Sequence, residues 1–146
     1  MAEGGPDKLS LVVHSGDYGK IHYALGMAAA SAAVGRTATL FFTMEALKAL
    51  LKPAADGSPA WRKLPADGRA GAAGAIDDGY IAKGVAGFEE LLTSSVDLGV
   101  RFLVCDMGLR ALDLTRADLR GDVPVETGGV VTFLNDASGR GAVVVV

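Results

Sequence analysis

Short apolar runs alternate along this chain with longer segments of helical period, and this alternation limits the folds that the chain can adopt. The runs cover residues 9–13, 38–42, 100–105 and 141–146. Mostly apolar runs of this length are typical of strands buried on both faces of a parallel sheet. Between the first two, residues 18–34 carry apolar side chains at helical spacing. A strand–helix–strand unit of this size predicts a right-handed parallel crossover.

We therefore expect an α/β fold, namely a three-layer α/β/α sandwich around a mostly parallel sheet of four or five strands, flavodoxin-like in style. The length favours one domain over residues 1–146, with residues 1–8 as a flexible lead-in. Three further helices, a shorter helical stretch and one short edge strand are also predicted. The helices cover residues 44–51, 84–98 and 127–137, a shorter helical stretch follows Asp106, and the strand covers residues 123–125.

Residues 53–83 differ from the rest because they show no clear period. They contain five of the glycines and three of the five prolines. We expect a long mobile loop here, with one turn of helix near Trp61. A loop of this length is either a lid, a binding loop or an oligomer contact, or it is a tolerated surface insertion. The sequence leaves these alternatives open.

Composition narrows the function classes. The net charge is −3 and no basic block occurs, which argues against nucleic acid as a partner. No apolar run approaches the roughly 18 residues of a membrane span, and the first residues do not form a signal peptide. We therefore expect a cytoplasmic protein without stable membrane insertion. A single cysteine excludes an internal disulfide and a cysteine-cluster metal site, and we expect neither a metal nor a cofactor.

The carboxyl ends of parallel strands meet at one edge of a sheet, where ligands of α/β proteins bind. Three loops are predicted to leave that edge, after residues 13, 42 and 105. We expect them to form a pocket around Cys105. Its other predicted residues are His14, Ser15, Gly16, Asp17, Thr43, Asp106 and Met107. If the first and third strands are neighbours, His14 and Cys105 lie within side-chain reach of each other.

Cys105 is the candidate for chemistry because it stands where a strand ends and a helix begins. Free backbone N–H groups at such a position favour the thiolate, and His14 could act as its base. The Asp106 carboxylate beside the thiol would raise the pKa of the thiol and so disfavour the thiolate. The alternative is that Cys105 is a small buried hydrophobe, which is the common role of a lone cysteine.

The other candidates also have two interpretations. His14 either contributes to the site or hydrogen-bonds a neighbouring loop, while His22 is expected to be exposed or packed on its helix. Residues 15–17 resemble an anion cradle at a helix start, but they lack a dinucleotide-binding glycine pattern and a P-loop lysine. Asp17 serves either as a helix N-cap or as a catalytic acid.

Several segments resemble the DsrE/DsrF-like family, close to its stand-alone DsrE-like members, which are often labelled "peroxiredoxin family protein". The most specific segment ends at Cys105, where the family places its cysteine. The similar segments are LVVHSGD (11–17), ATLFFT (38–43), FEELL (88–92), LGVRFLVC (98–105) and GGVVTFL (128–134). Together they span nearly the whole chain.

This resemblance implies an α/β/α fold and homo-oligomers, often trimers or multiples of three. It also implies a sulfur-relay role, in which Cys105 carries sulfane sulfur as a persulfide, as a possible sulfurtransferase. The partners would be a sulfur donor or acceptor protein, or a low-molecular-weight thiol. Because the chain has one cysteine, turnover would need an outside thiol. The alternatives are a non-catalytic small-molecule-binding module and an oligomeric assembly module that use the same pocket.

Overall fold

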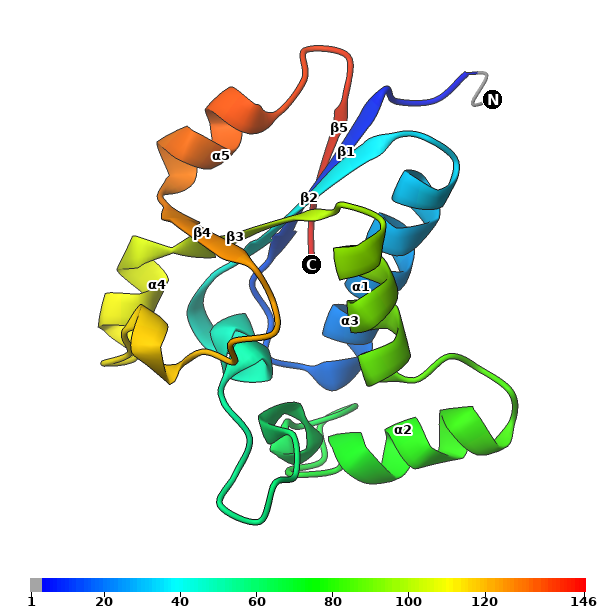
Figure 1. Cartoon of the computed structure of the whole chain (residues 1–146), viewed down its shortest axis with the longest axis vertical. Helices are drawn as coiled ribbons and strands as arrows, with labels where there is room; N and C mark the ends of the chain where they lie inside the picture. Colours follow the sequence, from blue (N-terminus) through cyan, green and yellow to red (C-terminus); the bar gives the residue numbers. More distant parts are fainter. Residues whose placement is uncertain (1–3) are drawn as a thin grey trace.

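The structure is a computed structural model that describes residues 4–146. Five strands form one sheet in the order β4-β3-β2-β1-β5, and every neighbouring pair is parallel (Figure 1). The strands are β1 (Lys8–Val13), β2 (Thr37–Phe42), β3 (Arg101–Cys105), β4 (Val125–Gly128) and β5 (Ala142–Val145). The sheet therefore confirms the predicted α/β class and its parallel strands.

Helices connect the strands and lie on both faces of the sheet. They are α1 (Tyr18–Ala33), α2 (Ala73–Ala82), α3 (Phe88–Asp97), α4 (Asp106–Ala111) and α5 (Val130–Asp136), with 3-10 helices η1 (Met44–Leu50), η2 (Ala60–Lys63) and η3 (Arg116–Asp118). Figure 1 shows α1 and α3 on one side of the sheet and α5 on the other. This arrangement gives the three layers expected of an α/β/α sandwich. Among residues 4–146, no helix combines the length and apolarity needed to cross a bilayer.

The main core lies between the sheet and the layer of α1 and α3. Alternate residues of β1 point into it, and Leu11 and Val13 are fully buried there. The opposite face of the sheet buries a smaller cluster. That cluster consists of Phe41, Leu103, Cys105 and Phe133, with Val12 packed against it. The two faces thus differ greatly in the amount of apolar surface that they bury.

Residues 53–83 are not the structureless loop that the sequence suggested. The expected turn near Trp61 is present as η2, but α2 was not predicted. Trp61, Leu64 and Ala73 from this segment belong to the main core. The prediction failed because the buried face of α2 consists of Ala73, Gly74 and Asp77, which are small or polar and show no hydrophobic period.

Other element boundaries shift by a few residues. The predicted helix after Thr43 is the 3-10 helix η1, and Thr43 is its N-cap without a side-chain cap bond. The edge strand predicted at residues 123–125 begins at Val125 and lies at the edge of the sheet, as its proline indicated. The expected lead-in at residues 1–8 falls partly outside the described residues, and Lys8 already belongs to β1.

Candidate functional site

A cavity of about 470 Å³ lies beside the carboxyl ends of β1 and β2. Three segments surround it, namely the loop after β1, helix η1 and the turn at residues 63–68. The lining residues are Ser15, Gly16, Asp17, Glu45, Lys48, Lys63, Leu64, Pro65 and Gly68. The cavity therefore contains three of the predicted site residues. The other six were missed. Four of them belong to residues 63–68, and sequence spacing does not show that this segment returns to the loop after β1; Glu45 and Lys48 lie in η1, beyond the predicted Thr43.

This cavity shares the loop after β1 with the point where the strand order of the sheet reverses, which lies between β1 and β5. The chain builds outward from β1 to β4 and then returns to the other side of β1 as β5. In open α/β sheets, ligands bind beyond the carboxyl ends of the strands at such a switch point. The backbone N–H groups of His14 and Ser15 donate to the carbonyl oxygen of Val146. The loop after β1 is thereby tied to the chain beyond β5 at this point.

The loop that forms one wall of the cavity is held by Asp17. Its carboxylate accepts the backbone N–H of Lys20, as the N-cap of α1, and the backbone N–H of Asp67 at 2.8 Å. The backbone N–H of Tyr18 donates to the carbonyl of Pro65, also at 2.8 Å. Asp17 thus joins the start of α1 to the turn at residues 63–68. This favours the N-cap interpretation, because both carboxylate oxygens already accept hydrogen bonds.

Positive charge in the cavity comes from two lysines on different elements. Lys48 pairs with Glu45 at 2.6 Å, and both side chains are about half exposed. Exposed pairs of this kind contribute little to stability, so this pair separates easily. Lys63 is exposed and forms no ion pair with any residue from 4 to 146. The cavity therefore offers two ammonium groups beside a partly apolar floor of Leu64 and Pro65.

A buried polar network supports the other side of the turn at residues 63–68. The hydroxyl of Tyr18 donates to Asp77, which also accepts the backbone N–H of Phe88 at 2.7 Å. Burial and the bond to Asp77 raise the pKa of Tyr18 far above its usual value, so the phenol stays protonated and donates. Tyr18 also stacks on Trp61, whose indole N–H donates to Glu89. These contacts connect the segment containing residues 60–88 to α1.

Cys105 lies in a different environment. It lies where β3 ends and α4 begins, as predicted. It is the N-cap residue of α4, but it is only 1 % exposed. Its packing partners are the apolar side chains of Phe41, Leu103 and Phe133. In this conformation the thiol is a small buried hydrophobe, and a reagent reaches it only if the α5 layer moves.

The predicted approach of His14 to Cys105 is wrong, because their strands are not neighbours. Strand β2 lies between β1 and β3. Two strand spacings separate the backbones by roughly 10 Å. The sequence could not decide this order, since the same alternation of elements is compatible with several sheet arrangements. His14 is exposed at the end of β1 and is thus not placed to act on the thiol.

The remaining predicted residues lie around the end of β3 or β2. Thr43 is buried, and the close approach of its loop to α4 leaves no room for a side chain at Gly108. Asp106 and Met107 begin α4 with exposed side chains. None of these three lines the cavity beside β1 and β2. The predicted site residues therefore separate into a group at the cavity and a group near Cys105.

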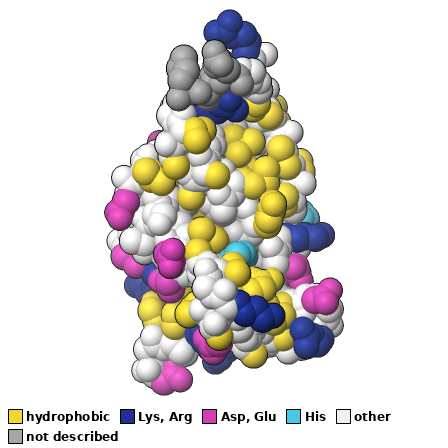
Figure 2. Space-filling model, turned by 90° about the vertical axis from the view of Figure 1, so that its right-hand side faces the viewer, with side chains coloured by type: hydrophobic (Ala, Val, Ile, Leu, Met, Phe, Trp, Pro, Cys, Tyr) yellow, Lys and Arg dark blue, Asp and Glu magenta, His cyan; other side chains and the backbone are white. Residues whose placement is uncertain are grey.

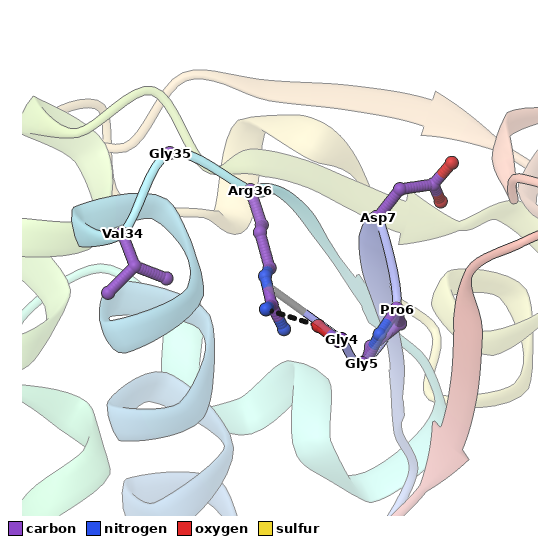
Figure 3. A pocket seen from close by; sticks show the side chains of 7 residues that line it. All are labelled: Gly4, Gly5, Pro6, Asp7, Val34, Gly35 and Arg36. Atoms are coloured by element: carbon purple, nitrogen blue, oxygen red, sulfur yellow. Dashed lines mark hydrogen bonds between the residues drawn. The ribbon is translucent and has the colours of Figure 1, made fainter. Parts of the chain in front are cut away.

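A second cavity, of about 460 Å³, lies at the opposite end of the sheet (Figure 3). It is lined by residues 4–7 and 34–36. The guanidinium of Arg36 points across it and donates to the carbonyl of Gly4 at 2.7 Å. Because this cavity faces the amino ends of the strands, it lacks the topological argument that favours the first one. Within residues 4–146, no group of three His, Cys, Asp or Glu side chains is placed to hold a metal ion.

Comparisons with known proteins support the fold. No protein-family model matches this chain, and no curated protein matches it significantly. Among solved structures, the chain is similar to a protein of unknown function, MTH1491 from Methanobacterium thermoautotrophicum. The two share 13 % identity with a TM-score of 0.55, over 95 % of this chain and 98 % of that one. At this identity the similarity concerns the α/β fold alone.

Proposed function

We propose that this chain is a cytoplasmic protein that binds a small anionic molecule in the cavity beside the carboxyl ends of β1 and β2. The observation that carries the proposal is the meeting of two lysines from separate elements, Lys48 and Lys63, beyond the carboxyl ends of β1 and β2 in a parallel sheet. Asp17 does not oppose an anion strongly, because its carboxylate already accepts two backbone N–H groups. Lys63 supplies the charge that remains free for a ligand.

Calorimetric titration tests this proposal with three probes: inorganic phosphate, thiosulfate and adenosine 5′-monophosphate. They represent a bare anion, an anion with sulfane sulfur and a larger ligand with an apolar part. At least one of them is expected to bind to the wild type. Lys63→Ala should weaken that binding about tenfold, the effect of losing one charge-assisted contact.

Lys52→Ala is the matched control, because Lys52 is an exposed lysine outside the cavity lining. It should leave the affinity unchanged. The proposal is contradicted if none of the probes binds, or if Lys63→Ala and Lys52→Ala have equal effects. Circular dichroism of each variant confirms that the fold is retained.

The second candidate function is sulfur relay, with Cys105 as a persulfide carrier. Its support is the position of the thiol at the end of β3, under a helix of only seven residues. The Cys105 thiolate would attack the outer sulfur of a donor persulfide. The new S–S bond would form as the donor S–S bond breaks, and the electron pair would leave on the donor thiolate. An outside thiol would then accept the sulfur from Cys105.

Intact-mass measurement after incubation with a low-molecular-weight persulfide tests this second function. The expected result is the added mass of one sulfur atom on the wild type and none on Cys105→Ser. No added sulfur on the wild type, under conditions that load a known carrier, excludes the relay. The calorimetric result at the cavity is independent of this outcome, because the two groups of residues lie at different strands.

A further inference from the structure

The face of the sheet under α5 is only partly covered. A row of side chains crosses this face through paired positions of neighbouring strands, from Leu103 through Phe41 and Val12 to Val145. Phe133 of α5 packs over the first two members of the row. At the other end Val145 is 68 % exposed, and Val143 on the same face of β5 is 52 % exposed. We call the surface of Val12, Val143 and Val145 the β5 strip.

Helix α5 itself carries apolar side chains on its outer side. Val130, Val131 and Leu134 are 50 %, 70 % and 57 % exposed. We call these three residues the α5 ridge. Residues 130–135 and 142–146 contain no charged side chain. The adjacent carboxylate of Asp136 is neutralised by Lys8 and Arg101, so it adds little unpaired charge beside the ridge.

Strip and ridge together are unusual for a protein that functions alone. All-parallel sheets occur almost always with both faces covered by helices. Strand β5 is also an edge strand, and its apolar side chains lack the charges with which proteins normally protect such an edge. A further layer of protein over the β5 strip would cover the open face of the sheet and would also shield the apolar edge strand.

We propose that this layer is the α5 ridge of a second copy of the chain. The ridge is a convex apolar helix surface and the strip is a flat apolar sheet surface, and the two belong to the same face of one molecule. A two-fold axis would place each ridge on the strip of the other copy, which is the reciprocal geometry of an isologous dimer. The exposed apolar side chains suggest on the order of 500 Å² buried per copy, or about 1,000 Å² in total, the lower limit for a specific interface.

This contact has a consequence for Cys105. Because Phe133 covers the thiol and belongs to α5, a partner seated on the outer side of α5 would hold that cover in place. Alkylation of Cys105 should therefore slow as the protein concentration rises.

Sedimentation equilibrium over the micromolar range tests the interface with Val131→Glu, Val145→Glu and the control Tyr23→Glu. Tyr23 is 72 % exposed on α1, on the opposite side of the sheet. Figure 2 views the molecule from the right-hand side of Figure 1, where α1 and α3 lie, and hydrophobic side chains gather in the upper half of this view. There α1 and α3 already cover the sheet, so Tyr23→Glu adds the same charge without touching strip or ridge.

The wild type is expected to self-associate. Val131→Glu and Val145→Glu should each weaken that association tenfold or more, while Tyr23→Glu leaves it unchanged. All three side chains are mostly exposed, so melting curves should stay close to that of the wild type. A wild type that remains monomeric throughout overturns the proposal. So does a set of variants in which Tyr23→Glu dissociates the assembly and Val131→Glu does not.

Disulfide trapping tests the arrangement itself. Val131→Cys and Val145→Cys are made separately on a Cys105→Ser background, mixed and mildly oxidised. A mixed disulfide between the two variants is expected, because position 131 of one copy would face position 145 of the other. Mixing Tyr23→Cys with Val145→Cys should give none. Trapping of the control pair alone, or of neither pair in a sample that self-associates, overturns the two-fold arrangement.

Discussion

The face of the sheet under α1 and α3 and the face under α5 are built from the same five strands, yet they are covered to very different extents. The first buries a continuous core with a polar network whose donors and acceptors are paired. The second buries an apolar cluster of four residues, one of which is Cys105, and leaves the β5 strip and the α5 ridge exposed. We call the face under α1 and α3, which stabilises the monomer, the finished face. We call the face under α5, which leaves apolar surface for a partner, the unfinished face.

The largest expected effect lies on the finished face. Asp77→Ala would leave the Tyr18 hydroxyl and the Phe88 N–H buried without their acceptor. Two lost hydrogen bonds to a charged group should lower the free energy of unfolding by about 4 kcal/mol. Urea denaturation measures this loss. The control is Asp78→Ala, since Asp78 is exposed and pairs only at the surface with Arg62; equal effects of the two variants would contradict the assignment of the network.

A somewhat smaller effect is expected on the unfinished face. Phe133→Ala removes the aromatic side chain that stacks on Phe41 and covers Cys105. The cavity should lower the free energy of unfolding by about 3 kcal/mol, the low end for such a change, because few residues surround the site. Alkylation of Cys105 by iodoacetamide should become at least tenfold faster. Unchanged alkylation would show that Phe133 does not control access, and Val131→Ala provides the control on the outer side of α5.

The smallest expected effect concerns the attachment of α5 to the sheet through Asp136. Burial alone would raise the pKa of this carboxyl, but hydrogen bonds from Thr39, Lys8 and Arg101 outweigh burial and hold the pKa below its ordinary value. Its contribution to stability is therefore present above the unfolded-state pKa of about 3.9 and is lost as the pH falls through the lower folded-state pKa.

Asp136→Asn should lower the free energy of unfolding at pH 7 by about 2 kcal/mol. It should also flatten the pH dependence below about pH 4. Denaturation series at several pH values measure both effects. Asp97→Asn on the exposed side of α3 should retain the acid dependence of the wild type. If Asp136→Asn and Asp97→Asn show the same pH dependence of the free energy of unfolding, the contacts of Asp136 do not anchor α5 to the sheet.

Much of the fold could be predicted from the sequence because its signals are local. The apolar runs of β1, β2 and β3, and the helical spacing from Ile21 to Ala32, are set by side-chain periodicity that any three-dimensional arrangement must respect. The position of Cys105 at a strand end followed from the same pattern. Helix α2 escaped prediction because its burial depends on Asp77, a polar residue whose partners lie 59 and 11 positions away in the chain.

The sequence by itself determined which segments are strands and that their carboxyl ends share one edge. Only the tertiary structure decided which strands are neighbours, and with that which side chains meet. By placing β2 between β1 and β3, it separated His14 from Cys105. By returning residues 63–68 to the start of α1, it brought Lys63 to the same cavity as Ser15. The physical reason is that strand order and long-range loop contacts depend on packing between distant segments, which no local pattern records.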